Sequence, residues 1–206
     1  MTLRIDPAAP PFSFRVDGTP FRELLGEWSC EEITDQTDTD CKWSYRSPDH
    51  TVCVCVEGKR FNDFGAIEWT LHFYNHGLDD GPRIHDVASL DWSFPVSAGE
   101  KAVLHYAKGS RCRVDDFLPR EQVLADGVPI SLAPNGGRSS DGVLPFMNLH
   151  AGDDGLVVGV GWTGQWSAAF HRTGDSVQLT AGMEALDFFL HAGESVRTPS
   201  ILLIPW

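Results

Sequence analysis

The chain is poor in basic residues: 16 Lys and Arg stand against 29 Asp and Glu in 206 residues, which gives a formal charge of −13. Such a surface repels phosphate backbones, and no cluster of Lys and Arg stands out that would override the net field. We therefore expect no nucleic-acid partner. An acidic surface of this kind is compatible with the binding of neutral ligands such as sugars.

Long apolar segments are missing too. The N-terminal stretch MTLRIDPAAPPFSF lacks the apolar core of a signal peptide, and no run approaches the roughly 20 apolar residues that span a bilayer. There is no Asn-x-Ser/Thr sequon, and the five cysteines are an odd number. These features predict a cytoplasmic, reducing setting without membrane contact, and they leave a Cys30–Cys41 disulfide open as an alternative.

Signatures of a self-sufficient catalytic centre are absent from the sequence as well. There is no Gly-x-Ser-x-Gly nucleophile elbow and no phosphate-binding loop. His72, His76 and His85 do not follow the spacing of a zinc site, and the acidic run over 31–40 lacks the pattern of a calcium loop. Acidic residues are too numerous for a general acid and base to be selected. We predict no catalytic residue, no metal and no cofactor.

No amphipathic helix longer than two turns is evident, although 20–28 or 115–124 could form a short one. Alternating patterns dominate instead: Trp69, Leu71 and Phe73 are apolar between more polar neighbours, which is typical of a half-buried strand. Further predicted strands are 51–56, 87–94, 102–107, 156–162, 167–171, 176–181, 186–190 and 200–204. With Gly and Asp turns between them, they predict one all-β domain over 1–206, built from two packed antiparallel sheets.

Two of the seven tryptophans, Trp162 and Trp166, flank a glycine-rich turn with the sequence Trp-Thr-Gly-Gln-Trp. Indole rings can stack on the flat C–H faces of sugars while a nearby amide binds the hydroxyl groups. The alternative is that these indoles fill a wide sandwich core and satisfy their N–H groups locally, as buried tryptophans commonly do.

A second glycine-rich stretch covers 136–142 and contains Arg138 and Asp141. Glycines allow the backbone to approach a ligand closely, and the two charged side chains could form the floor of a polar pocket. The alternative is a long loop that is held together by a local ion pair between Arg138 and Asp141.

Three blocks of the C-terminal third, taken in order, resemble a known family. They are Gly-Gly-Arg-Ser-Ser-Asp-Gly-Val-Leu-Pro-Phe-Met-Asn-Leu at 136–149, Gly-Val-Gly-Trp-Thr-Gly-Gln-Trp at 159–166 and Leu-His-Ala-Gly-Glu-Ser-Val-Arg-Thr-Pro-Ser-Ile-Leu-Leu at 190–203. The stretch Asp-Phe-Gly-Ala-Ile-Glu-Trp at 63–69 fits the same pattern. Together they resemble the N-terminal domain of α-galactosidase-like enzymes of glycoside hydrolase family 36.

This resemblance implies a β-supersandwich of the galactose mutarotase type, placed ahead of a (β/α)-barrel that holds the catalytic aspartates. It implies a non-catalytic module whose partners are that barrel and an α-galactoside-type sugar, with contacts that support a homo-oligomer. The parent protein would be a glycoside hydrolase, and this chain alone would be inactive. The motif positions that could contact sugar are Asp63, Phe64, Trp69, Arg138, Asp141, Trp162, Gln165 and Trp166.

Two alternatives to an accessory domain remain open at this point. The first is a free-standing carbohydrate-binding module for galactosides. The second is a mutarotase-like enzyme, which needs a glutamate base and a histidine acid facing one sugar. Glu68 and His72 are the closest such pair in the sequence.

Overall fold

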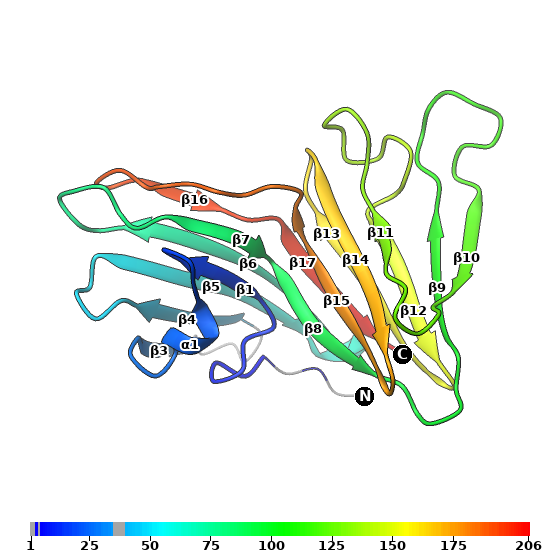
Figure 1. Cartoon of the computed structure of the whole chain (residues 1–206), viewed down its shortest axis with the longest axis horizontal. Helices are drawn as coiled ribbons and strands as arrows, with labels where there is room; N and C mark the ends of the chain where they lie inside the picture. The colour runs from blue at the N-terminus through cyan, green and yellow to red at the C-terminus, as the bar shows by residue number, and fades with distance from the viewer. Residues whose placement is uncertain (1–2, 4, 35–39) are drawn as a thin grey trace.

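The computed structural model describes residue 3, residues 5–34 and residues 40–206. These residues form two layers of antiparallel strands and two short helical segments, α1 (Phe21–Leu24) and η1 (Asn62–Phe64) (Figure 1). The prediction of an all-β supersandwich of antiparallel sheets is confirmed, with the difference that the second layer is divided into two smaller sheets. No helix in the described part of the chain is long and apolar enough to cross a membrane.

The first layer is one large sheet in which all neighbours are antiparallel. Its strands lie in the order β10 (Pro119–Val123), β9 (Ala102–Ala107), β12 (Phe146–Ala151), β13 (Asp154–Gly161), β17 (Ser200–Pro205), β6 (Ala66–Asn75), β5 (Val52–Phe61), β4 (Asp40–Arg46) and β3 (Ser29–Thr34). The short strand β16 (Ser195–Arg197) also pairs with β6. Figure 1 shows the strand direction turning between β4 and β9, as the twist of a large sheet requires.

The second layer consists of two smaller sheets that meet end to end. One contains β2 (Thr19–Pro20), β1 (Ser13–Val16) and β7 (Ile84–Ala88), and the other contains β11 (Ile130–Leu132), β14 (Trp166–Thr173), β15 (Ser176–Met183) and β8 (Leu90–Pro95). Only Ser89 separates β7 from β8, and its carbonyl accepts a hydrogen bond of 2.9 Å from the indole N–H of Trp69 on the large sheet. The interruption in the second layer is therefore tied to the first.

Alternation along the strands places the apolar side chains between the layers. In β6 the burial pattern alternates over nearly the whole strand, with Trp69, Leu71 and Phe73 in the core. Near the N-terminus the rings of Phe14 and Phe21 stack 4.3 Å apart. Cys53 and Cys55 of β5 are buried on the opposite face from the core valines, so this strand is covered on both faces.

Most of the predicted strands are confirmed, and 102–107 matches β9 at both ends. Residues 186–190 contain only an isolated bridge, between Ile84 and Phe188, so the strand predicted there is wrong. Of the two segments that could form a short helix, 20–28 contains α1 and 115–124 contains none. Residues 119–123 form the edge strand β10, whose side chains are all exposed, and pairing with β9 decides its conformation.

The structure argues against a Cys30–Cys41 disulfide. In the β3–β4 hairpin Cys30 lies opposite Tyr45, and Cys41 lies opposite Thr34. Four residue steps therefore separate the two cysteines along the hairpin, roughly 13 Å at the rise of a strand. A disulfide needs Cα atoms closer than about 7 Å.

The junction between β16 and β17 contains a buried hydroxyl that completes the sheet. Thr198 is fully buried, its N–H donates to the Leu71 carbonyl at 2.9 Å, and its Oγ1 accepts from the Leu71 N–H at 3.1 Å. The same hydroxyl donates to the Pro199 carbonyl at 3.0 Å. The side chain therefore replaces a backbone acceptor where the strand is interrupted.

We expect Thr198→Val to lower the free energy of unfolding by about 1–3 kcal/mol, because the buried N–H of Leu71 loses its acceptor. The matched control is Thr180→Val on β15, a half-buried threonine with no side-chain hydrogen bond in the described residues. Its expected cost is within about 0.5 kcal/mol. Urea denaturation measures both values, and equal costs would contradict the role given to Thr198.

Candidate functional site

The two glycine-rich motifs lie against each other at one end of the sandwich. The Gln165 side chain donates to the Pro134 carbonyl at 2.6 Å and accepts from the Gly137 N–H at 3.0 Å. The indole N–H of Trp166 donates to the Ser139 carbonyl at 2.8 Å. The turn over 162–165 therefore holds the loop over 134–142 in place, mostly through backbone groups of that loop.

The ion pair between Arg138 and Asp141 forms, and a second arginine joins it. Arg138 donates to one carboxylate oxygen of Asp141, and Nε of Arg111 donates to the other at 3.0 Å. The Asp141 side chain is only 12% exposed, whereas that of Arg138 is 77% exposed. One carboxylate thus stabilises two guanidinium groups, and the outer one faces solvent.

The tryptophans proposed for sugar contact differ in their surroundings. Trp69 and Trp166 are 1% and 0% exposed, so neither ring can stack on a sugar while the core is folded. Trp162 is half-buried, and the Arg197 guanidinium lies 5.5 Å from its ring centroid in a cation–π contact. Trp69 and Trp166 are therefore core-packing residues. Of the three tryptophans predicted to contact sugar, Trp162 is the one that stays partly exposed.

Asp63 and Phe64 do not join this cluster. They lie in η1 between β5 and β6, where the next residue, Gly65, packs near Pro205 at the end of β17. The turn over 162–165 follows Gly161, which pairs with Ser200 at the start of β17. The two groups are therefore separated by the length of β17, roughly 17 Å at the rise of a strand. Both Asp63 and Phe64 are exposed.

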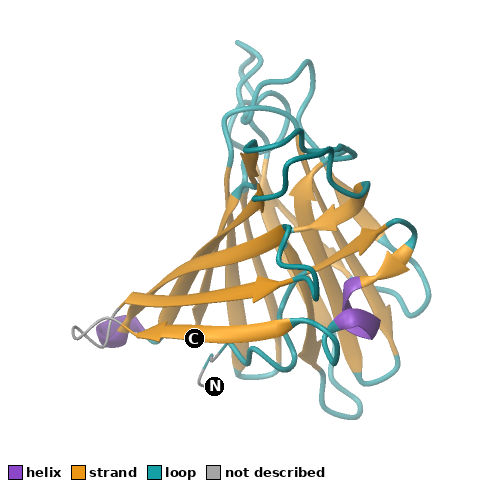
Figure 2. Cartoon of the chain, turned by 90° about the vertical axis from the view of Figure 1, so that its left-hand side faces the viewer, coloured by secondary structure: helices purple, strands orange, loops and turns teal. Residues whose placement is uncertain are grey.

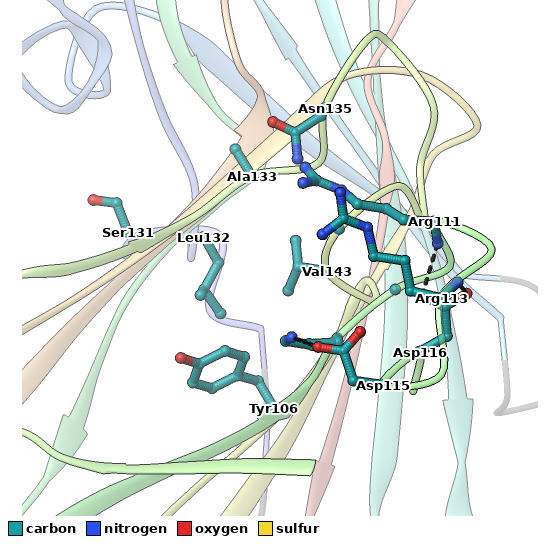
Figure 3. A pocket seen from close by; sticks show the side chains of 13 residues that line it. Tyr106, Arg111, Arg113, Asp115, Asp116, Ser131, Leu132, Ala133, Asn135 and Val143 are labelled. Carbon is teal, nitrogen blue, oxygen red and sulfur yellow. Dashed lines mark hydrogen bonds and ion pairs between the residues drawn. The ribbon is translucent and has the colours of Figure 1, made fainter. Parts of the chain in front are cut away.

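The structure adds a cleft that the sequence did not predict, between the loop over 108–118 and the loop over 133–143. It has a volume of about 300 Å³. Figure 3 shows the side chains of Arg111, Arg113 and Asn135 directed toward one another at its rim, with Tyr106 on the far side. The expectation of no cluster of Lys and Arg strong enough to override the net acidic field is not tested by this local group of arginines, which lies beside three carboxylates. Arg111, Arg113 and Arg138 are brought together by folding, and the only signal in the sequence was the spacing of Lys108, Arg111 and Arg113.

The acid and base required by a mutarotase-like mechanism do not face each other. Glu68 accepts a hydrogen bond from Ser200, and His72 Nε2 lies 3.5 Å from a carboxylate oxygen of Glu57. Glu68 and His72 are four residues apart on one strand, roughly 13 Å. In the described ranges no group of three or more His, Cys, Asp or Glu side chains is placed to hold a metal ion.

Comparison with known proteins gives matches in structure alone. No family model and no curated protein matches the chain. A GH36 α-galactosidase from Geobacillus stearothermophilus matches with a TM-score of 0.69 and 14% identity over 96% of this chain and 30% of that chain. The α-galactosidase from Lactobacillus brevis gives a TM-score of 0.70 and 14% identity, over 96% of this chain and 29% of that one.

This chain has the fold of one part of these enzymes. The family resemblance seen in the sequence is thereby confirmed at the level of the fold, and the chain spans less than a third of the enzymes' length. A protein from Escherichia coli K12 named as an aldose 1-epimerase also matches, with a TM-score of 0.52, 13% identity and coverage of 88% of this chain and 69% of that chain. The mutarotase-type architecture is shared with it.

The burial difference between two tryptophans predicts that their removal lowers the free energy of unfolding by different amounts. We expect Trp166→Ala to cost about 3–5 kcal/mol, because it leaves a large cavity and frees the Ser139 carbonyl. The matched variant Trp162→Ala, in the same turn, should cost less than about 2 kcal/mol. Urea denaturation followed by fluorescence measures both, and similar costs for the two variants would contradict the structural role of Trp166.

Proposed function

We propose that the chain is the non-catalytic N-terminal β-supersandwich domain, over 1–206, of an α-galactosidase-like glycoside hydrolase. In this role it packs on a catalytic (β/α)-barrel and shapes the mouth of the sugar site. The observation that carries the proposal is the match over 96% of this chain to 30% of the Geobacillus stearothermophilus enzyme. The catalytic residues, the α-galactoside substrate and the carbohydrate metabolism of the parent enzyme all belong to the proposal.

An apolar patch on the outer face of the large sheet supports a packing role. Its members are Phe146, Val157, Leu202, Ile204 and Trp206, and we call it the outer patch. They point away from the core, since their neighbours Met147, Val158 and Leu203 are buried within it. The solvent-facing side of an antiparallel sheet is normally polar, so a run of apolar side chains across three strands is typical of a covered surface.

The outer patch extends along β17 and ends, at Trp206, where the exposed loop residues predicted for sugar contact also lie. Phe64 is 71% exposed and lies on η1, near Pro205, and Trp206 is 54% exposed. An exposed aromatic ring beside a packing surface is suited to entering a neighbouring site. We assign to Asp63 and Phe64 the contribution to the sugar site, and to Trp69, Gln165 and Trp166 the support of the fold.

A cytoplasmic location and a homo-oligomer are further parts of the proposal. The cysteines whose side chains are described, Cys30, Cys53, Cys55 and Cys112, form no disulfide. Burial raises the pKa of the Cys53 and Cys55 thiols above the ordinary value, so they stay protonated and unreactive at neutral pH. This arrangement is compatible with a reducing compartment.

The coding sequence downstream of codon 206 tests the proposed function directly. We expect it to continue into a (β/α)-barrel with paired catalytic aspartates, because the matching fold makes up 30% of the α-galactosidases. A stop codon directly after Trp206 would contradict the proposal and favour a free-standing sugar-binding module. Hydrolysis of an aryl α-galactoside by the purified 206-residue chain would contradict the non-catalytic role.

The outer patch predicts how the isolated chain behaves in solution. We expect it to self-associate as its concentration rises, and Phe146→Asp to weaken this association, because a charge in an apolar contact must be desolvated. Leu78→Asp is the matched control, since Leu78 is 95% exposed and lies outside the patch. Sedimentation velocity measures both variants. Equal effects of the two substitutions, or a chain that stays monomeric, would contradict the assignment.

A further inference from the structure

The cleft between the loops over 108–118 and 133–143 carries an inference that does not depend on the proposed function. It contains an unusual concentration of positive charge for this chain. Four basic side chains line the cleft or the more open hollow that adjoins it: Lys108, Arg111, Arg113 and Arg138. Three carboxylates lie among them, those of Asp115, Asp116 and Asp141. The chain as a whole carries 29 acidic and 16 basic residues.

The carboxylates of the cleft are already engaged, and one guanidinium is not. Lys108 pairs with Asp115, and Arg111 and Arg138 share Asp141. Asp116 accepts the backbone N–H groups of Arg111 and Arg113, at 2.9 and 3.1 Å, and these bonds hold its pKa below the ordinary value. None of the ion pairs among the described residues includes Arg113, although the pKa of Asp115, lowered mainly by the hydrogen bond from Lys108, is lowered further by the charge of Arg113. Arg113 is exposed, so its guanidinium is accessible to an anion from solvent.

The loops are held in a fixed geometry, which makes the cleft a preformed site. A Cβ on Gly109 would lie 1.8 Å from the Ser140 carbonyl, so the two loops touch backbone to backbone. Cys112 and Phe117 have φ values of 58° and 62°, a strained conformation for residues other than glycine. Such strain persists only where the surroundings enforce it, and it is concentrated at functional sites.

The remaining walls of the cleft suit a small carbohydrate. Leu132 and Val143 form an apolar floor, and Tyr106 and Ser131 stand at one side with a ring and a hydroxyl group (Figure 3). A volume of about 300 Å³ lies at the lower end of the range for small-molecule sites. A monosaccharide has the apolar C–H face and the hydroxyl groups that such walls bind.

We infer that this cleft binds a small sugar that carries one acidic group, carboxylate or phosphate. The acidic group pairs with the guanidinium groups of Arg111 and Arg113 and with the Asn135 amide. The ring rests on Leu132 and Val143 beside Tyr106. Arg113 is the specificity-determining residue, because its guanidinium is exposed and forms no ion pair within the described part of the protein.

Titration of the 206-residue chain with galacturonate, galactose 6-phosphate, galactose and inorganic phosphate, followed by NMR, tests the inference. We expect at least one acidic sugar to bind with a Kd of about 1 mM or lower, and galactose and inorganic phosphate each to bind about tenfold more weakly. Raising the salt concentration should weaken binding of the acidic sugar. Comparable binding of inorganic phosphate, or no binding of either acidic sugar, would overturn the inference.

Arg113→Gln removes the unpaired guanidinium and keeps the backbone N–H that Asp116 binds. We expect it to weaken binding of the acidic sugar about tenfold, the loss typical of a charge-assisted hydrogen bond. The matched control is Arg120→Gln, which removes the same charge from β10, in the same β9–β10 hairpin but outside the cleft. Similar losses in the two variants would show a general charge effect and overturn the site. Unchanged chemical shifts elsewhere verify that Arg113→Gln is folded.

Discussion

The rest of the structure depends on aromatic side chains that fill the space between the two layers. Packed sheets lie about 10 Å apart, and large rings reach across that gap more readily than aliphatic side chains. Trp43, Trp69 and Trp166 are almost fully buried there. The bond from Trp69 to the Ser89 carbonyl also joins the large sheet to the one-residue break between β7 and β8. Because these rings hold the layers together, they are not available to a ligand.

Strands with one face in the core could be predicted from sequence, because their side chains alternate. Strands β6, β9 and β15 show this, with buried positions at every second residue over most of their length. Strand β10 could not be predicted, because every one of its side chains is exposed and its backbone conformation comes from pairing with β9. The break at Thr198 also escapes a pattern argument, since its hydroxyl replaces a backbone acceptor for the N–H of Leu71, which is far away in the sequence.

The motif residues were predictable as a group, and their roles were not. Residues 136–142 and 162–166 do lie together, because both amide ends of Gln165 bind the glycine-rich loop. Sequence spacing does not reveal that Trp166 points inward, nor that η1 with Asp63 and Phe64 lies at the opposite end of β17. Arg111 and Arg138 are 27 positions apart, and they meet only because the β9–β10 and β11–β12 loops emerge at the same end, as the loops at the top of Figure 2 illustrate.

The two ends of the sandwich therefore have different physical characters. At one end, exposed Phe64 lies close to Pro205 and so to Trp206, the last member of the outer patch, where association is driven by burial of apolar area. At the other end, a strained loop with little buried surface holds Arg111 and Arg113 in a chain whose net charge is −13. A loop that buries little contributes little to stability, and strained backbone conformations there cost about 1–3 kcal/mol each. Its shape is held by the hydrogen bonds of Asp116 to the N–H groups of Arg111 and Arg113 and by the contact of Gly109 with Ser140, so the guanidinium groups are positioned by polar contacts and not by the core beneath.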